Sequence, residues 1–380
     1  MIFRKNIYLD NGATTMVDPK VVNAMGKYFS EKYGNASSSH SYGRDAKNAL
    51  ESARKIIAKS IGAKAKEIVF TSGGTESNNL AIKGVAFAKG KGHIITTKIE
   101  HKCVLNSCKW LEKQGFEVSY LDVDENGFLR VEDLEKELRK DTILVSIIHG
   151  NNEIGTIQDL EKIGKICRDK NIYFHTDACQ SFTKTEIKVN KQHLDLVTLN
   201  SHKIHGPKGV GALYIREGVE ITALIHGGGQ ERKIRAGTEN ISGVVGFAEA
   251  VRIANKKDIK QMEKLRDKLI KGVLKIPDSK LNGARKKRLC NNTNFSFEKI
   301  EGEAIGGYLD QKGITSSTGS ACSEANLEPS YVLKAINLTD EQANGSLRLT
   351  LSRFTTEEDI DYVLKVLPEI IKKLRRFSPL

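Results

Sequence analysis

Residues 198–211, TLNSHKIHGPKGVG, place one lysine between two histidines and then form a turn. The segments on either side, LDLVTLN at 194–200 and VGALYIR at 210–216, have the pattern of buried strands. Lys203 therefore lies on a loop between strands, restricted by glycines and a proline. A lysine on a rigid loop inside an apolar framework is poorly solvated, so its amine loses its proton more easily and can attack a carbonyl carbon. Most lysines of a basic protein are solvated surface residues, so the groups around Lys203 must decide between the two interpretations.

The composition is that of an ordinary globular protein. Hydrophobic residues make up 39% of the 380 residues, and there is no run of about 18 apolar residues that could cross a membrane. The opening segment MIFRKNIYLDNG lacks the apolar core of a secretory signal, so we expect a cytoplasmic protein without membrane contact. The six cysteines are scattered, without a CxxC pair or a His/Cys cluster, which argues against a disulfide framework and a structural zinc site.

The formal net charge of +13 allows two interpretations. The lysines are spread along many predicted helices, and no aromatic RNA-binding motif accompanies them. We therefore expect solvated helix faces, with an acidic protein or an anionic cofactor as partner, and no direct binding of nucleic acid.

Strand-like and helical segments alternate through the first two thirds of the chain. The strand-like segments are EIVFT (67–71), HIITTK (93–98), FEVSYLD (116–122), TILVSIIH (142–149), IYFHTD (172–177), LDLVTLN (194–200) and VGALYIR (210–216). Helical patterns separate most of them, at 74–89, 102–114, 131–140 and 158–170. This alternation predicts an α/β fold in which a mainly parallel seven-stranded sheet is covered on both faces, with ligands at the carboxyl ends of the strands.

The pattern changes after residue 217. A long helix is predicted from about 242 to 273, and the remainder is a smaller α+β unit that includes the loop STGSACSEANLEPS at 317–330. We expect a large domain of residues 15–260 and a small α+β domain made of residues 1–14 and 261–380.

The segment SGGTESNN at 72–79 follows a predicted strand and opens a helix. Gly73 and Gly74 let backbone N–H groups converge at the positive end of the helix, and Thr75 adds a hydroxyl group. A phosphate fits there. A plain glycine turn with Thr75 as the helix cap is an equally good interpretation of these residues alone.

Other polar groups also follow strands. Asp177, with Gln180 one turn later, ends one strand, and a protonated ring nitrogen would be a suitable partner for this acid. His101 offers a flat ring after a second strand, and HGNNE at 149–153 offers carboxamides after a third. Taken singly, these residues could be a helix cap, an ordinary core histidine and a polar turn. Together with Lys203 they match pyridoxal phosphate, which needs a phosphate cup, a lysine, an acid and a group against its ring.

Long motifs identify a family. These are YLDNGATT, FTSGGTESNN, EHKCV, HGNNEIGTIQ, HTDACQ, SHKIHGPKGVGALYIR, HGGGQERKIRAGTEN, STGSACSEANLEPSYVL and LRLTLSRFTTEEDID. Over nearly its whole length the chain resembles the cysteine desulfurases of the iron–sulfur-cluster assembly type, which are class V aminotransferase-like enzymes of fold-type I that depend on pyridoxal phosphate.

The resemblance implies a role for each matching residue. Lys203 binds the cofactor aldehyde as a Schiff base, Asp177 contacts the pyridine nitrogen, and His101 stacks on the ring and takes part in catalysis. The further contacts are Gln180 and Asn152 near the phenolic oxygen, Gly74, Thr75 and His202 at the phosphate, Thr238 from the second subunit of a homodimer, and Arg348, with Asn152, at the substrate carboxylate. One position departs from the family, because Asn200 stands where a serine usually contacts the phosphate; either its amide or Ser201 would have to replace that contact.

Cys322 is the remaining candidate. It lies in a Gly/Ser-rich stretch without apolar periodicity, whereas Cys103, Cys108 and Cys167 fall in helical patterns that predict buried, small hydrophobic residues. The resemblance implies that Cys322 receives the substrate sulfur as a persulfide, and that it is a transient iron–sulfur ligand shared with a scaffold protein.

The sequence thus predicts conversion of L-cysteine to L-alanine, with sulfur supplied for iron–sulfur cluster assembly and for tRNA thiolation. The expected partners are L-cysteine, a second copy of the chain, a scaffold protein and other sulfur acceptors. His101 or the substrate amine is expected to help form the Cys322 thiolate. Two alternatives remain open at this stage: a related enzyme such as a selenocysteine lyase or another class V aminotransferase, and a catalytically silent scaffold.

Overall fold

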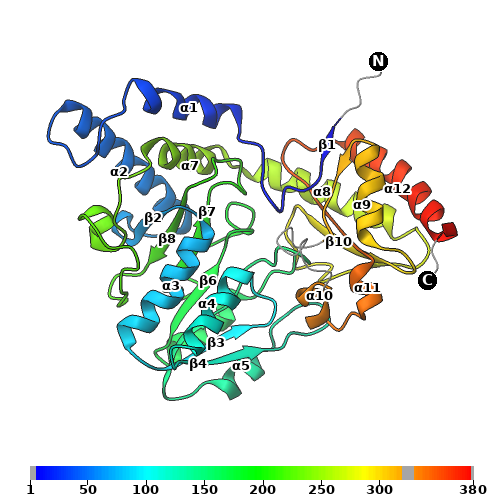
Figure 1. The fold of residues 1–380 in the computed structure, drawn as a ribbon, viewed down its shortest axis with the longest axis horizontal. Coiled ribbons are helices and arrows are strands. Elements are labelled where there is room, and N and C mark those ends of the chain that lie inside the picture. The colour runs from blue at the N-terminus through cyan, green and yellow to red at the C-terminus, as the bar shows by residue number, and fades with distance from the viewer. Residues whose placement is uncertain (1–5, 319–328, 378–380) are drawn as a thin grey trace.

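The computed structural model describes residues 6–318 and 329–377, and its centre is one seven-stranded sheet (Figure 1). In spatial order the strands are β2 (Ile68–Thr71), β8 (Gly211–Ile215), β7 (Leu196–Asn200), β6 (Tyr173–Asp177), β5 (Thr142–Ser146), β3 (His93–Thr97) and β4 (Glu117–Leu121). Within the described residues, no helix has the length and apolar character needed to span a membrane.

Strand direction confirms the prediction of a mainly parallel sheet. Strands β4, β3, β5, β6 and β7 run parallel to one another, whereas β8 runs antiparallel to both β7 and β2. Two reversals restore the direction, so β2 points the same way as β7. The carboxyl ends of all strands except β8 therefore lie at one edge of the sheet.

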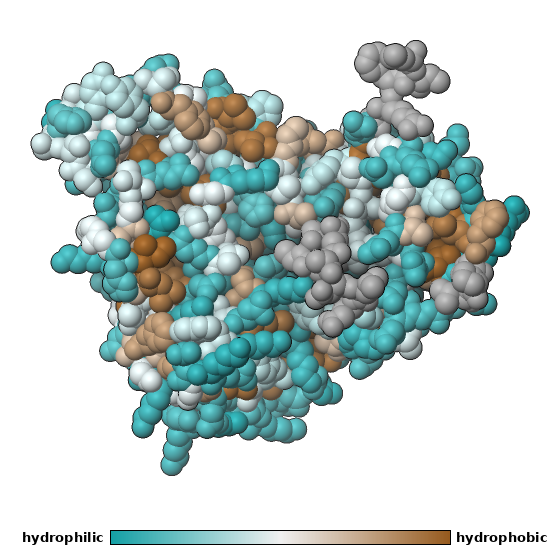
Figure 2. Space-filling model, in the orientation of Figure 1, coloured by the Kyte–Doolittle hydropathy of each residue, from teal (hydrophilic) through white to brown (hydrophobic). Residues whose placement is uncertain are grey.

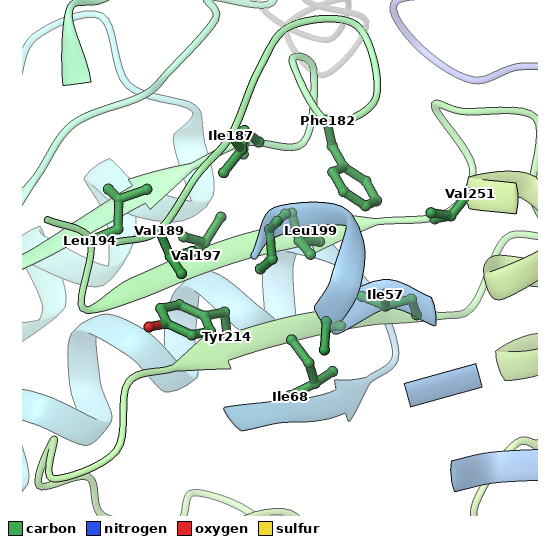
Figure 3. Packing of buried hydrophobic residues seen from close by; sticks show 14 of the residues in the cluster. Ile57, Ile68, Phe182, Ile187, Val189, Leu194, Val197, Leu199, Tyr214 and Val251 are labelled. Carbon is green, nitrogen blue, oxygen red and sulfur yellow. The ribbon is translucent and has the colours of Figure 1, made fainter. Parts of the chain in front are cut away.

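Helices cover both faces of this sheet, because alternate side chains of each strand point to opposite sides. They are α1 (Pro19–Ser30), α2 (Ser41–Ile61), α3 (Gly74–Lys89), α4 (Lys102–Glu112), α5 (Val131–Glu137), α6 (Leu160–Asp169) and α7 (Ile241–Ile253), with short 3₁₀ turns at Ala65–Glu67 and Gln230–Lys233. On β7, Val197 and Leu199 belong to the core that includes α2, α6 and α7, and Leu196 belongs to the core with α3 and α4. Figure 3 shows part of the first core around β7.

A second, smaller unit follows. It contains the antiparallel strands β9 (Ser279–Leu281), β10 (Asn292–Phe297) and β12 (Ser346–Thr350), the parallel pair β1 (Ile7–Tyr8) and β11 (Ile314–Thr315), and the helices α8 (Lys256–Val273), α9 (Gly302–Gln311), α10 (Tyr331–Ala335), α11 (Asp340–Asn344) and α12 (Glu357–Phe377). Its core joins Ile7 and Leu9 to residues from Leu265 onward. This separate core supports the predicted domains of residues 15–260 and of 1–14 with 261–380, which stay a prediction.

The single helix predicted for 242–273 is wrong, because two helices occupy this range. Helix α7 ends at Ile253, Ala254 is extended, and the Asn255 side chain caps α8 by accepting a hydrogen bond from the Asp258 N–H at 3.0 Å. Apolar periodicity continues across such a break, so it did not reveal the cap. Helix α2 likewise begins next to a side-chain cap, because the His40 ring accepts a hydrogen bond from the Gly43 N–H.

Two buried glutamates tie α10 to the large unit. The Ser330 hydroxyl donates to the carboxylate of Glu153, and the Tyr331 hydroxyl donates to the Glu100 carbonyl oxygen at 2.7 Å. Burial raises the pKa of both carboxyl groups, that of Glu100 to about 8. The chain that follows residue 328 is thereby fixed beside the strand ends that carry His101 and Asn152.

Replacement of Leu199 by alanine tests the role of β7 in the first core. Leu199 has no exposed surface, so Leu199→Ala should lower the free energy of unfolding by about 2–5 kcal/mol, measured by urea denaturation. The control is Leu274→Ala, at a side chain that is 41% exposed, which should change it by less than about 0.5 kcal/mol. Equal effects of the two variants would contradict this description of the core.

Candidate active site

A cavity of about 260 Å³ opens at the carboxyl edge of the sheet. Residues from five strand ends line it, together with the segment before α1. The predicted site residues that it brings together are Gly74, Thr75, His101, Asn152, Asp177, Gln180, Asn200, His202 and Lys203, and its remaining lining residues are Ala13, Asn78, Cys103, Ile148 and Cys179.

Three predicted residues in the described ranges do not line this cavity. Ser201 is buried beneath Gly206, and Thr238 is exposed on the loop before α7. Arg348 on β12 contacts a residue of the cavity wall, because its guanidinium donates to the Asn152 carbonyl oxygen at 3.1 Å. It also donates to the Asp10 carboxylate at 2.8 Å. Cys322 lies outside the described residues.

The amino end of α3 forms one wall. Gly73 adopts a φ of 156°, and Gly74 begins the helix so close to Cys179 that a Cβ atom there would lie 2.5 Å from the sulfur. Glu76 does not occupy the helix end, because it binds Arg235 at 2.8 Å and the Ser72 N–H at 2.7 Å. Burial opposes ionisation of Glu76, but these hydrogen bonds outweigh it and lower its pKa. Gly74 and Thr75, the first two residues of α3, line the cavity, and a helix amino end favours an anion.

Asp177 ends β6 as a buried carboxylate with two fixed donors. One oxygen accepts from the Cys179 N–H at 2.9 Å, and the other accepts from the Asn78 side-chain amide at 2.7 Å. No helix lies between Asp177 and β7, so the interpretation of Asp177 as a helix cap is wrong. The Asp177 carboxylate lines the cavity, which is the position that a partner for a protonated ring nitrogen needs.

His101 caps α4, and its Nδ1 accepts the Cys103 N–H at 3.2 Å. Burial lowers the pKa of His101, and the charge of Lys203 lowers it further. The prediction that Cys103 is a buried core residue is wrong: its side chain is partly exposed and lines the cavity. Its position on the first turn of the helix that His101 caps was the available signal.

Lys203 follows β7 and reaches the cavity beside His202. The Nδ1 atom of His202 lies 3.1 Å from the Thr14 hydroxyl, and burial together with the charge of Lys203 lowers the pKa of His202 to about 4. The ring is therefore neutral at pH 7 and can hydrogen-bond a phosphate without carrying a charge.

The cavity fits pyridoxal phosphate. Side-chain carbonyl oxygens of Asn78, Asn152 and Asn200 are buried there without a hydrogen-bond partner among the described residues, so the cavity can still satisfy polar groups of a ligand. The α3 end would hold the phosphate, Asp177 the ring nitrogen and Lys203 the aldehyde carbon.

Comparison with known proteins decides the family. The sequence matches the family described as aminotransferase class-V over residues 7–363. A Dictyoglomus turgidum protein named cysteine desulfurase IscS is 54% identical over 383 residues, which cover 99% of this chain and 97% of that protein. The chain belongs to the cysteine desulfurases of the iron–sulfur-cluster assembly type. It is thus an enzyme and not a catalytically silent scaffold.

Solved structures confirm the fold of this cysteine desulfurase. A NifS-like protein superposes with a TM-score of 0.91 at 42% identity, covering 97% of this chain and 100% of that protein. SspA in complex with cysteine has a TM-score of 0.83 at 38% identity and covers 92% of this chain and 100% of SspA. The α/β architecture of fold-type I is therefore established for this desulfurase.

Gly74 and Cys179 provide a test of the crowding at the α3 end. Gly74→Ala should lower the free energy of unfolding by about 1–3 kcal/mol, because the new methyl group has to displace the Cys179 sulfur. The double variant Gly74→Ala/Cys179→Ala should be more stable than the sum of the two single effects predicts. Additive effects in the denaturation measurements would show that this contact is not limiting.

Proposed function

We propose that this enzyme binds pyridoxal phosphate in the cavity and converts L-cysteine to L-alanine there, passing the sulfur to Cys322 as a persulfide. The observation that carries the proposal is that one cavity combines an amine, a buried carboxylate, a flat ring and a helix amino end, on Lys203, Asp177, His101 and α3. The structure of SspA with cysteine supports the choice of substrate.

The cofactor, when bound, stabilises negative charge at the carbon that carries the substrate amino group. Asp177 keeps its carboxylate directed at the cavity because both oxygens accept fixed hydrogen bonds. Lys203 would hold the aldehyde carbon of the cofactor, and its amine, once free, could accept a proton from the carbon that carries the substrate amino group. Asn152 and Gln180 line the same cavity and can hydrogen-bond polar groups of the cofactor ring.

Arg348 is the proposed partner of the substrate carboxylate. It is 2% exposed, so its positive charge must be balanced, and Asp10 provides the balance at 2.8 Å. Its Nε has no partner among the described residues, which leaves a donor for an arriving carboxylate. The planar guanidinium can bind a carboxylate through two parallel hydrogen bonds.

Cys322 is the proposed sulfur acceptor on the strength of the family motif. Its thiolate attacks the substrate sulfur, a sulfur–sulfur bond forms, and the carbon–sulfur bond breaks. The electron pair of the broken bond stays on carbon, which takes up a proton, and the product leaves as alanine. The persulfide then passes its outer sulfur to an acceptor.

We further propose a homodimer in which Thr238 serves the cavity of the partner. Thr238 is exposed, and Val22 and Phe29 on α1 are exposed hydrophobic side chains. Figure 2 shows hydrophobic surface in the region of α1. Such a surface suits burial against a second copy.

The proposed acceptors are an iron–sulfur scaffold, with Cys322 as a transient cluster ligand, and proteins of tRNA thiolation, all in the cytoplasm.

The acceptor role of Cys322 is tested by replacing it with serine. Cys322→Ser should lower sulfide release from L-cysteine by at least about 1000-fold, because the attacking nucleophile is lost. Mass spectrometry of the wild-type peptide that contains residue 322 should show one added sulfur atom. The control Cys167→Ala, at a thiol that does not line the cavity, should retain both. Normal release by Cys322→Ser would refute the role, and amine transfer that depends on a keto acid would favour an aminotransferase.

Lys203 is tested by spectroscopy. Lys203→Ala should lose the visible absorption band that pyridoxal phosphate shows when bound to a lysine, and turnover should stop. Lys208→Ala is the matched control, because Lys208 lies on the same loop but is exposed and does not line the cavity. An unchanged spectrum in Lys203→Ala would assign the cofactor to another amine.

A further inference from the structure

A chain of hydrogen bonds joins Asp177 to His101 through Asn78 and Cys103. The Asn78 amide nitrogen lies 2.7 Å from Asp177 Oδ2 and 3.1 Å from the Cys103 sulfur, and that sulfur lies 2.9 Å from His101 Nδ1. Asn78 has no exposed surface, so it has no access to bulk solvent as an alternative partner.

The direction of each hydrogen bond in this chain follows from chemistry. A carboxylate only accepts, so the NH₂ group of Asn78 must face Asp177, and its second hydrogen points to the Cys103 sulfur. The His101 Nδ1 already accepts the Cys103 backbone N–H at 3.2 Å, so this nitrogen carries a lone pair and no proton. In the contact between Nδ1 and the Cys103 sulfur the thiol is then the donor, and it shares the one Nδ1 lone pair with the backbone N–H.

The cysteine is suited to this role because it stays protonated. Burial raises the pKa of the Cys103 thiol to about 12, with a further contribution from Asp177. The charged groups that face His101 are Lys203 after β7, Lys102 on α4 and Asp177 on β6; burial and the two lysines lower the pKa of the ring, against the effect of Asp177.

We propose that Cys103, oriented by Asn78, is a positioning residue that holds neutral His101 in the tautomer with its proton on Nε2. The ring then presents an N–H donor to the cavity, and it cannot serve as a base at Nε2 unless the cap of α4 breaks. This inference rests on the proposed function, which gives His101 a place in turnover. His101 then donates a proton to the departing product, and the substrate amine deprotonates Cys322.

The tautomer can be read directly by ¹⁵N NMR of the holoenzyme labelled in its histidines. The signals of residue 101 are assigned by their absence in His101→Asn. The wild-type spectrum at a pH where the ring is neutral should show the proton on Nε2. In Cys103→Ala the midpoint of the His101 titration should rise by about half a unit to one unit, because Nδ1 loses one donor. Cys103→Ser, whose hydroxyl can donate in place of the thiol, should stay near the wild-type value.

Cys108→Ala is the matched control, because Cys108 lies on the same helix and does not line the cavity; its His101 titration should be unchanged. A proton on Nδ1 in the wild-type neutral ring would overturn the proposal, whether or not the alanine variant folds. An unchanged titration in Cys103→Ala would overturn the role of Cys103.

Alanine release from L-cysteine by Cys103→Ala should be several-fold slower and recover in Cys103→Ser. If only the titration changes, the tautomer stands and the proposed role of His101 in turnover is wrong.

Discussion

The close approach of the β7–β8 hairpin to the glycine turn before α3 is the constraint on which the site depends. Gly211 pairs with Asn200 on one side and Thr71 on the other, and a Cβ atom at Gly211 would lie 2.7 Å from the Gly73 Cα. Only hydrogen fits in that space. Because β8 is reversed between two strands of equal direction, the lysine loop and the proposed phosphate cup are held together by backbone.

Much of this arrangement could be predicted from sequence because it is local. The alternation of side chains along a strand determines which strand residues face each core. The ends of the predicted strands indicate where polar side chains gather, as for Lys203 and Asp177. The sequence analysis missed the break between α7 and α8, because the apolar pattern continues through the asparagine whose side chain caps α8. Asn78 had no local signal because its partner lies 99 residues away, and Asp10 pairs with an arginine 338 residues away. Such contacts arise only when the units are assembled.

Burial makes the cysteine thiols in the described ranges less reactive. It raises the pKa of every cysteine in the described ranges, to about 12 for Cys103 and Cys108 and about 11 for Cys290, with Cys167 and Cys179 also raised. A buried thiol that keeps its proton is a poor nucleophile. The described part of the chain therefore offers no strong competitor for the sulfur proposed to reach Cys322, although Cys103 and Cys179 line the cavity itself.

With Arg348 in its proposed role as the partner of the substrate carboxylate, its ion pair with Asp10 affects how the enzyme distinguishes small thiols. The guanidinium is neutralised before any substrate arrives, so a thiol must bring its own carboxylate to replace or share that partner. Cysteamine, which has the amine and the sulfur of cysteine but no acid group, has nothing to exchange. The free-energy cost of separating Arg348 from Asp10 therefore selects against thiols that lack a carboxylate, and the strength of this ion pair sets the degree of selection.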